Sequence, residues 1–322
     1  MFALLLAGCG GDSADDVQRP VEKENTEICI NTNVAKMQTR ATTYDNVSAL
    51  QSDHVDIRGF AYYHDTETSY LNNNGENLHY DATPPAGWKF WVNEAQTHYY
   101  WPIEGSVYDP SSTNITVSSL DFVGYCPYTR PGYITAEPTY NHSTGISFSA
   151  NMASFMTNSN QADVKEFMCA IASNRTAAGG AVPLEFKHPF ALIKFVIAEG
   201  SGTHVQVNSI SISDLNTNAT CTYNGSTISW DSHLGSAAMS QTGLNLKYGT
   251  SSTATDYFIV IPNNYGSKTL TVNGTWDDWS AVTKDISTNI SINWQPGCIY
   301  TYNLTVTPTA LIVKTDKYTE QW

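Results

Sequence analysis

Along most of the chain, apolar and polar residues alternate with a period of two. In the segment 28–34, for example, isoleucine, threonine and valine alternate with cysteine or asparagine. Such alternation predicts half-buried β-strands. The segment 190–197 is apolar at nearly every position, which is typical of a strand buried on both faces. Turn dipeptides such as Asn74-Gly75 and Asn224-Gly225 separate the segments. Many short strands joined by polar turns predict an all-β fold built from antiparallel β-sandwiches.

A loose stretch rich in Ala, Gly and Asn at 173–181 divides the predicted strands into two sets. The sequence therefore predicts a leader and tether over 1–27, a first sandwich domain over 28–178 and a second over 179–322. The segment 167–172 fits a helix or a strand by composition. Its short length and the glycines that follow it favour a strand.

Composition narrows the function classes. The chain carries 16 Lys and Arg against 30 Asp and Glu, for a net charge of −14. A chain this acidic, with no local basic cluster, has no electrostatic footprint for nucleic acid. Aromatic residues make up 12% of the chain, which argues against a disordered protein because these side chains are costly to leave in water. The sequence contains no apolar stretch of about 18 residues, so no membrane helix is predicted.

The N-terminus carries a lipid-attachment pattern. An apolar run over residues 2–8 leads directly to Cys9, and Leu6-Ala7-Gly8-Cys9 looks like the lipobox of a bacterial lipoprotein. An acidic, polar tract follows and reads as a solvated tether. We therefore expect a lipoprotein held at the outer membrane through lipidated Cys9. The alternative is a chance apolar N-terminus with one core cysteine.

Motifs for catalysis and metal binding are missing from the sequence. It contains no HExxH, GxSxG, P-loop or GxGxxG pattern, and no pair of cysteines at CxxC spacing. We predict no enzymatic activity, no cofactor and no metal site. A sandwich hydrolase with a site assembled from distant loops is the weakest of three hypotheses. Free thiols are the default for the cysteines beyond Cys9, with disulfide pairing left open; these are Cys29, Cys126, Cys169, Cys221 and Cys298.

Aromatic residues are dense between residues 88 and 125, where Trp88, Trp91 and Trp101 lie. Exposed tryptophans stack on sugar rings, so these three are the candidate platform of a surface carbohydrate-binding lipoprotein, the second hypothesis. The competing interpretation is that the rings fill the core or pair across strands, and an aromatic-rich sheet favours that interpretation.

Several segments, taken in order, resemble the fimbrillin family of Bacteroidetes, the subunits of protease-assembled surface pili. They are the residues 28–41, 57–63, 100–102 leading to 120–127, 182–195, and 294–304. The segment 182–195 carries the most recognisable pattern. Pro189 departs from it, since such proteins often have a small residue there, and proline limits backbone pairing.

The resemblance implies two tandem transthyretin-like β-sandwich domains and export as a lipoprotein. It also implies that a trypsin-like protease cuts after an arginine near the end of the first strand. The matching residue is Arg40, with Ala41 as the new N-terminus. The displaced first strand would then contain Ile28, Ile30 and Val34. The alternative is that Arg40 is an ordinary loop residue and the strand is never removed.

The implied partners are other pilin subunits, in a homo- or hetero-polymer, besides the processing protease and the outer membrane. A sandwich that lacks a strand exposes apolar surface and unpaired backbone, and an extended segment of a neighbour restores both. The candidate donor is the segment Leu311, Ile312 and Val313, whose alternative role is an ordinary edge strand. Shaft, tip and anchor positions all remain open at this point.

Overall fold

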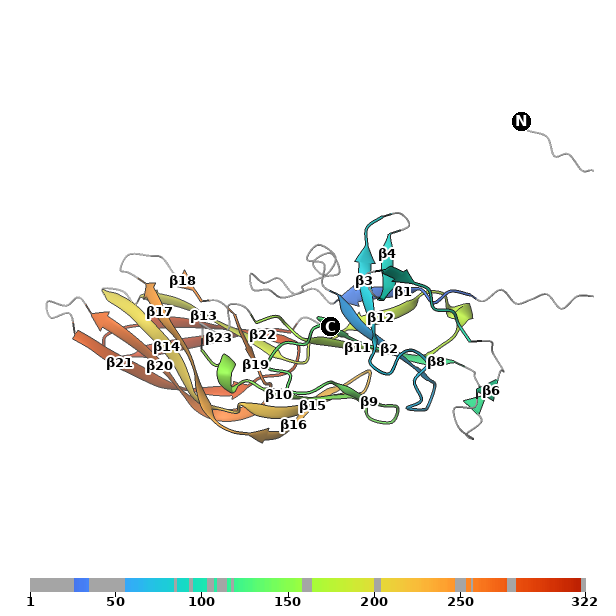
Figure 1. The fold of residues 1–322 in the computed structure, drawn as a ribbon. Helices are drawn as coiled ribbons and strands as arrows, with labels where there is room; N and C mark the ends of the chain where they lie inside the picture. Colours follow the sequence, from blue (N-terminus) through green and yellow to red (C-terminus); the bar gives the residue numbers. More distant parts are fainter. Residues whose placement is uncertain are drawn as a thin grey trace, which may run out of the picture.

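The structure, a computed structural model, describes residues 26–34, 56–83, 86–92, 95–102, 107–108, 115–116, 119–157, 164–199, 204–246, 253–255, 257–276 and 282–319. These residues form an elongated molecule of β-sheets (Figure 1). Across these ranges the only helical turns are two short 3-10 turns, η1 (Ala153–Phe155) and η2 (Ala177–Gly179). The all-β prediction is confirmed.

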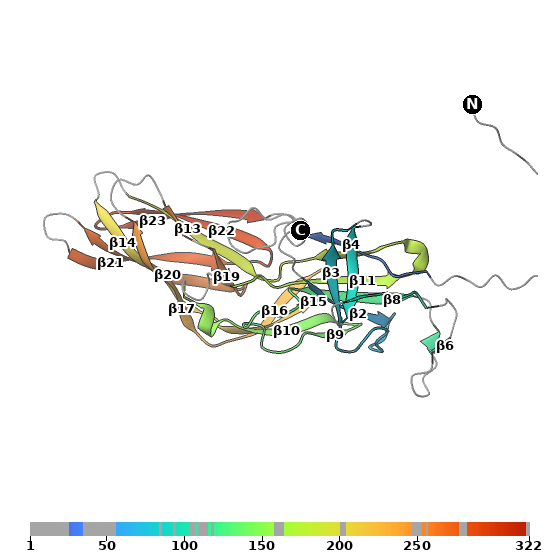
Figure 2. The ribbon, with the colours of Figure 1, turned by 45° about the horizontal axis from the view of Figure 1, so that its top comes forward.

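An eight-stranded sheet occupies one end of the molecule (Figure 2). Its strand order is β11 (Met168–Arg175), β8 (Leu120–Cys126), β2 (Ile57–Tyr63), β3 (Glu76–Asp81), β4 (Gly87–Val92), β1 (Ile30–Val34) and β12 (Val182–Phe186), with β5 (Ala95–Thr97) beside β4. The end strands meet, because Cys169 and Lys187 exchange backbone hydrogen bonds of 3.2 and 2.9 Å. The sheet therefore curls back on itself. The segment 167–172, which fitted either structure, lies mostly in strand β11.

A four-stranded sheet joins the two halves of the sequence. Its order is β16 (Ile228–Leu234), β15 (Asn218–Tyr223), β10 (Gly145–Asn151) and β9 (Thr139–Asn141). β10 pairs with β15 over six residues, from Ile146 opposite Tyr223 to Asn151 opposite Asn218. Both this sheet and strand β12 therefore connect residues on opposite sides of the boundary expected between 178 and 179. A separate small hairpin consists of β6 (Val107–Tyr108) and β7 (Ile115–Thr116).

Two further sheets form the other end of the molecule (Figure 1). One has the order β18 (Thr253–Ala254), β13 (Ala191–Glu199), β22 (Cys298–Val306) and β23 (Leu311–Thr319), with β19 (Phe258–Val260) also on β13. The other has the order β17 (Ala237–Leu246), β14 (Val205–Leu215), β20 (Asn264–Trp276) and β21 (Val282–Asn293). Strand β13 begins two residues after Pro189, which lies outside both β12 and β13 and accepts a 2.7 Å hydrogen bond from Trp230 Nε1.

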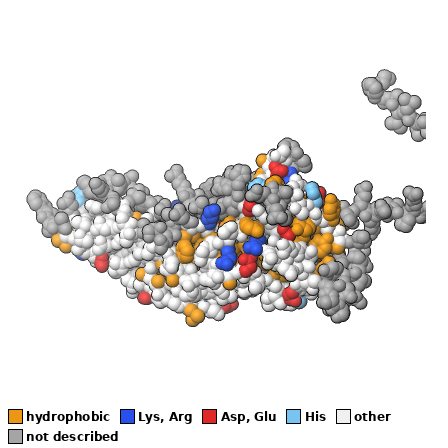
Figure 3. Space-filling view, viewed as in Figure 1, with side chains coloured by type: hydrophobic (Ala, Val, Ile, Leu, Met, Phe, Trp, Pro, Cys, Tyr) orange, Lys and Arg blue, Asp and Glu red, His pale blue; other side chains and the backbone are white. Residues whose placement is uncertain are grey.

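The alternating pattern places apolar side chains in two cores. A smaller core lies inside the eight-stranded sheet and includes Ile28, Ile30, Phe122 and Phe186. A larger core extends from the other face of that sheet through the rest of the molecule. The surface in Figure 3 has few charged side chains, and much of it is uncharged polar side chain and backbone. This agrees with a chain of which only 14% is charged.

Candidate functional site

The first strand, β1, is an interior strand of the eight-stranded sheet, between β4 and the last strand of the order, β12. It runs parallel to β12 over five residue pairs, from Ile30 opposite Val182 to Val34 opposite Phe186. On its other side it is antiparallel to β4, with Ile30 opposite Trp88. Since a central strand pairs on both edges, its removal would leave two neighbouring strands with unpaired backbone groups. We call the position between β4 and β12 the β1 slot.

The residues just before β1 are held by the segment that follows β5. The Ile28 amide donates to the Tyr99 carbonyl at 2.8 Å, and the Trp101 amide donates to the Thr26 carbonyl at 2.8 Å. On the opposite side, the Val182 amide donates to the Cys29 carbonyl at 2.8 Å. The β1 slot thus begins before the strand itself. Sequence reasoning missed these partners, because strand neighbours far apart along the chain leave no local pattern.

The two faces of the first strand differ sharply. Ile28, Ile30 and Thr32 are buried, whereas Cys29 and Asn31 are exposed. The buried face packs into the smaller core together with residues of β12 such as Leu184. Of the residues predicted for the displaced strand, Ile28 and Ile30 therefore lie in the core next to each other. Val34 ends the strand opposite Phe186, and its side chain is outside the described part of the structure.

Several polar side chains around the slot are paired. The Tyr99 hydroxyl donates to Glu76 Oε1 at 2.7 Å, and burial, together with that carboxylate, raises the pKa of Tyr99. Glu27, which precedes the first strand, lies 2.5 Å from His98 Nδ1 through its Oε1. On the β3–β4 hairpin, the hydrogen bond from Lys89 lowers the pKa of Asp81 to about 2. These pairs hold the strands around the slot rather than forming a reactive centre.

The predicted donor segment lies on β23, at the edge of its sheet. β23 is antiparallel to β22, with Leu311 opposite Val306 and Val313 opposite Leu304. Leu311 is buried, Val313 is half-buried and Ile312 is 53% exposed. The outer edge of β23 has no strand partner among the described strands. The segment is therefore an edge strand in this structure, and its three consecutive aliphatic residues put Leu311 and Val313 on the more buried face and Ile312 on the exposed one.

The predicted lipidation and cleavage residues fall elsewhere. Cys9, Arg40 and Ala41 lie outside the described residues, so the structure says nothing of their geometry. In the sequence, Arg40 comes six positions after Val34, the last residue of β1.

The three tryptophans predicted as a glycan platform do not share an exposed surface. Trp88 and Trp101 are 8% and 6% exposed and belong to the smaller core, where Trp101 packs edge-on against Phe122 at 5.5 Å. Trp91 is half-buried, with its ring centroid 5.2 Å from that of His79. The cause is the two-residue period of β4, which turns Trp88 inward and Trp91 outward. The platform is corrected: these rings are mainly core and cross-strand residues.

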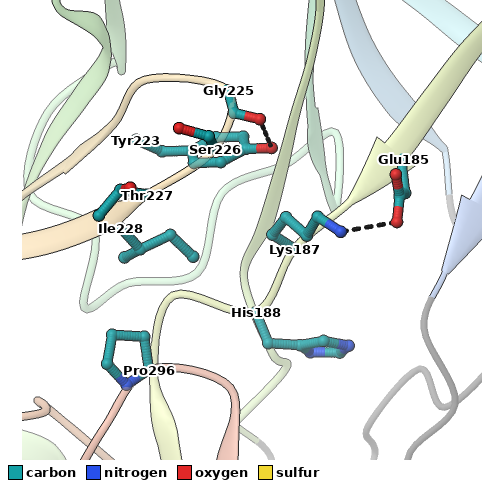
Figure 4. A pocket seen from close by; sticks show the side chains of 9 residues that line it. All are labelled: Glu185, Lys187, His188, Tyr223, Gly225, Ser226, Thr227, Ile228 and Pro296. Carbon is teal, nitrogen blue, oxygen red and sulfur yellow. Dashed lines mark hydrogen bonds and ion pairs between the residues drawn. The ribbon is translucent and has the colours of Figure 1, made fainter. Parts of the chain in front are cut away.

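A surface cavity of about 440 Å³ lies against the outer face of β12 (Figure 4). Lys187 Nζ is 2.6 Å from Glu185 Oε1 at one side, and the turn between β15 and β16 with Pro296 forms the others. The His188 ring points away from Ile228 and Pro296 and pairs with buried Glu166. Among the cavity's charged and histidine side chains, Lys187 is thus paired with Glu185 and His188 with Glu166.

The described residues contain free thiols, but no candidate metal site and no candidate membrane helix. Within those residues no group of three or more His, Cys, Asp or Glu side chains could hold a metal ion. Cys126, Cys169, Cys221 and Cys298 are buried free thiols, and Cys29 is an exposed one. Burial raises the pKa of the Cys126 thiol, which makes it unreactive. The same residues include no helix long and apolar enough to span a membrane.

The sequence matches the fimbrillin-like family over residues 39–322. The chain belongs to this family. A fimbrial protein from Bacteroides vulgatus ATCC 8482 has a similar structure, with a TM-score of 0.59 and 15% identity over 91% of this chain and 99% of that one. A candidate cell adhesion protein from Bacteroides uniformis ATCC 8492 gives a TM-score of 0.55 at 16% identity, with coverage of 91% and 99%. At such identities the likeness shows the fold. No curated protein matches the chain.

Family and fold together make the chain a pilus-type structural subunit of the cell surface. The matched region begins after β1, which spans Ile30–Val34. The first strand is therefore the part of the eight-stranded sheet that lies outside the family match.

Proposed function

We propose that this fimbrillin-like protein is exported as a lipoprotein and polymerises into a surface fimbria by exchange of its first strand. The observation that carries the proposal is that β1 pairs on both sides, parallel to β12 and antiparallel to β4. The loss of a strand at a sheet edge exposes the backbone of one neighbouring strand only. The loss of a central strand opens two backbone edges and a core at once, and only another strand repairs both.

The proposed sequence of events starts with lipid attachment at Cys9 and export to the outer membrane. A trypsin-like protease then cuts between Arg40 and Ala41. After the cut, only non-covalent contacts hold β1 in the sheet. An extended segment of a neighbouring subunit takes its place, and the candidate is the C-terminal strand β23. Because this contact is head-to-tail and does not close on itself, it produces a fibre.

The deciding experiment determines the N-terminus and mass of the protein in material sheared from the surface of the native cell. The proposal expects chains that start at Ala41 and form a high-molecular-weight ladder. An Arg40→Ala variant is expected to keep residues 9–40 and to lose the ladder. Lys36→Ala is the matched control, because Lys36 is the one other Lys or Arg between β1 and β2, and the substitution should change nothing.

Other outcomes are equally informative. A ladder from the Arg40→Ala variant would contradict the proposed cleavage. Chains that start at acylated Cys9 without any ladder would contradict polymerisation through this subunit and leave an anchor subunit or a monomeric surface lipoprotein. The structure gives no specific support for carbohydrate binding, since Trp88 and Trp101 are buried.

A further inference from the structure

Three arginines remain in the chain beyond Arg40. Residues 41–322 contain Arg58, Arg130 and Arg175 and no other arginine. A protease that cuts after arginine would meet all three in the folded subunit. Proteases nick folded proteins at exposed loop segments, because a bond must leave its regular hydrogen bonds before it fits a protease cleft. The three arginines lie in three different local structures, and each structure opposes cleavage in its own way.

Arg58 lies inside strand β2, where the backbone is paired on both sides. It is opposite Asn77 of β3 and opposite Tyr125 of β8. Its Nε donates to the Asn74 carbonyl at 2.7 Å, and its guanidinium lies 5.1 Å from the centroid of the Tyr128 ring. A cut after Arg58 requires the sheet to open, so a cut at this bond reports unfolding.

Arg130 lies in the loop 127–138, which links β8 to β9. Its neighbours Thr129 and Gly132 are exposed, and 37% of its own side chain is exposed. Its Nη1 donates to the Ile134 carbonyl at 2.6 Å. By position and exposure alone, this loop is the kind of segment that proteases cut.

The residue that follows Arg130 is Pro131. Hydrolysis of a peptide bond adds water, leaves a carboxyl group on the first residue and frees the amine of the second. Before proline, that amine is the ring nitrogen, which carries no N–H in the peptide, and the ring crowds the residue before it. A trypsin-like protease, which needs an ordinary amide at the leaving group, therefore leaves the Arg130–Pro131 bond intact.

Arg175 is the last residue of β11 and is exposed. The exposed residues 178–181 follow shortly after it, so exposure alone would make the bond after Arg175 a target. The residue before it, Asn174, has a φ of 55°, in the left-handed region. A protease cleft binds the residues beside the cut as an extended strand, and a left-handed residue turns the chain out of that path.

Asn174 is held in this conformation by two hydrogen bonds. Its amide donates to Asp121 Oδ1 at 2.8 Å, and its Oδ1 accepts a 2.7 Å hydrogen bond from Ser119 Oγ. Asp121 is 1% exposed, lies 2.8 Å from His64 Nδ1 and accepts a 3.2 Å hydrogen bond from the Tyr140 hydroxyl. Release of Asn174 would take one donor from this buried carboxylate, so the extended form that a protease needs is costly.

We propose that Pro131 and the left-handed Asn174 are specificity-determining residues of the processing step. They protect the bonds after Arg130 and Arg175, and cleavage of the folded subunit is thereby confined to Arg40. The proposal rests on the proposed cleavage at Arg40. It adds how the same protease spares the rest of the subunit, since a cut after either protected arginine would break the chain between two strands of the fold.

Limited digestion of the purified full chain with trypsin tests this protection. Trypsin also cuts after lysine, so each cut bond is assigned from the masses of the fragments. The unchanged chain is expected to be cut after Arg40 and to stay intact after Arg58, Arg130 and Arg175. A cut after Arg130 or Arg175 while the Arg58 bond stays intact would overturn the protection.

Pro131→Ala tests the role of the proline. It is expected to add a cut after Arg130, and an intact bond after Arg58 shows that the sheet is still folded. Pro138→Ala is the matched control, because it removes another proline of the same loop that follows Glu137 and not a basic residue. It should add no cut. If Pro131→Ala adds none either, the role assigned to Pro131 is wrong.

Asn174→Val and Asn174→Gly form a matched pair for the second bond. Both remove the side-chain oxygen that Ser119 bonds, but only valine makes the left-handed conformation costly, because its Cβ is branched. The valine variant is expected to be cut after Arg175 roughly tenfold faster than the glycine variant. Equal rates, or faster cutting of the glycine variant, would overturn the role assigned to Asn174.

The outcomes distinguish this inference from the proposed function. Cuts after Arg130 or Arg175 in the unchanged, folded chain would overturn the inference and leave the proposed cleavage at Arg40 standing. If Arg40 is never cut and the variants still release the two protected bonds, the proposed cleavage is contradicted, whereas the protecting roles of Pro131 and Asn174 are supported.

Discussion

The strands β1 and β22 occupy related places but are held very differently. Strands β12 and β13 follow each other along the chain with four residues between them. β1 runs parallel to β12, and β22 runs parallel to β13. β1 makes five pairs with its parallel neighbour, from Ile30 to Val34, whereas β22 makes eight, from Ile299 to Val306. The same parallel arrangement therefore holds both a strand that is proposed to leave and a strand that is proposed to stay.

Side-chain pairing shows the same contrast. In β22, the Tyr302 hydroxyl accepts a 2.9 Å hydrogen bond from Trp294 Nε1, and the Tyr300 hydroxyl donates to the Asn293 carbonyl at 3.0 Å. No side-chain nitrogen or oxygen of β22, all of which is described, is buried without a partner, whereas β1 has Thr32 Oγ1. Seven of the nine residues of β22 are buried, so the strand is enclosed on both faces.

The largest effect is expected from Tyr302→Ala in β22. The Tyr302 side chain is 1% exposed and its ring stacks on Phe195 with centroids 5.6 Å apart. Its truncation leaves a cavity in the larger core and an unpaired Trp294 Nε1. We expect a loss of about 4 kcal/mol in the free energy of unfolding, measured by denaturant titration. A loss below about 1 kcal/mol would show that β22 is not more strongly stabilised by its side-chain contacts than β1.

The counterpart in β1 is Ile30→Ala. Ile30 is 7% exposed in the smaller core, and its truncation should cost about 3 kcal/mol in the unprocessed chain. In a chain that lacks residues 1–40, and with them β1, the loss of stability caused by Tyr302→Ala should persist. Hydrogen exchange locates the effect, with faster exchange of the Ile30–Val34 amides expected in Ile30→Ala. Equal acceleration of the β22 amides would contradict two separately held strands.

A smaller effect is expected at alkaline pH, and it should involve β22. Burial raises the pKa of Tyr302 to about 12, against 10 for an exposed phenol, and the hydrogen bond from Trp294 offsets this in part. Since the folded-state pKa is the higher one, this contribution to stability is fully present below pH 10 and is lost as the pH rises toward 12. The free energy of unfolding, measured by circular dichroism, should therefore fall more steeply with pH between 10 and 12 than below pH 10.

Tyr302→Phe is the control for the alkaline prediction. It keeps the ring and removes the titrating hydroxyl, so the pH dependence between 10 and 12 should become shallower even though the variant is less stable overall. An unchanged slope would assign the alkaline sensitivity to other buried tyrosines such as Tyr300, whose pKa burial also raises.

Much of the fold was predictable from the period of two. The segment 190–197 is strand β13 over most of its length, and the alternation at 28–34 correctly places Ile28 and Ile30 on one buried face. The segment 182–195, which carries the most recognisable family pattern, includes all of β12, which pairs with β1, and the first five residues of β13, which pairs with β22. Local alternation works here because side chains in a strand point to opposite faces whatever the neighbouring strand is.

The candidate site was only partly predictable. The first strand and the C-terminal strand were found from their composition, but Thr32 carried no signal beyond its inward position. That its hydroxyl lacks a partner depends on residues of β4 and β12, which lie at least 50 positions away in sequence. The glycan interpretation of Trp88 and Trp101 failed for a related reason, since the sequence shows aromatic density but not which sheet face is covered.

By itself, then, the sequence determined that this chain is a β-protein of the fimbrillin-like family, and which side chains of each strand share a face. The tertiary structure alone decided that β1 is an interior strand, that strands from both halves share a sheet, and that Trp88 and Trp101 are core residues. The physical reason is that the pleat, set within a few residues, fixes which face a side chain takes. Pairing and burial belong to contacts between segments, and these exist only once the whole chain has folded.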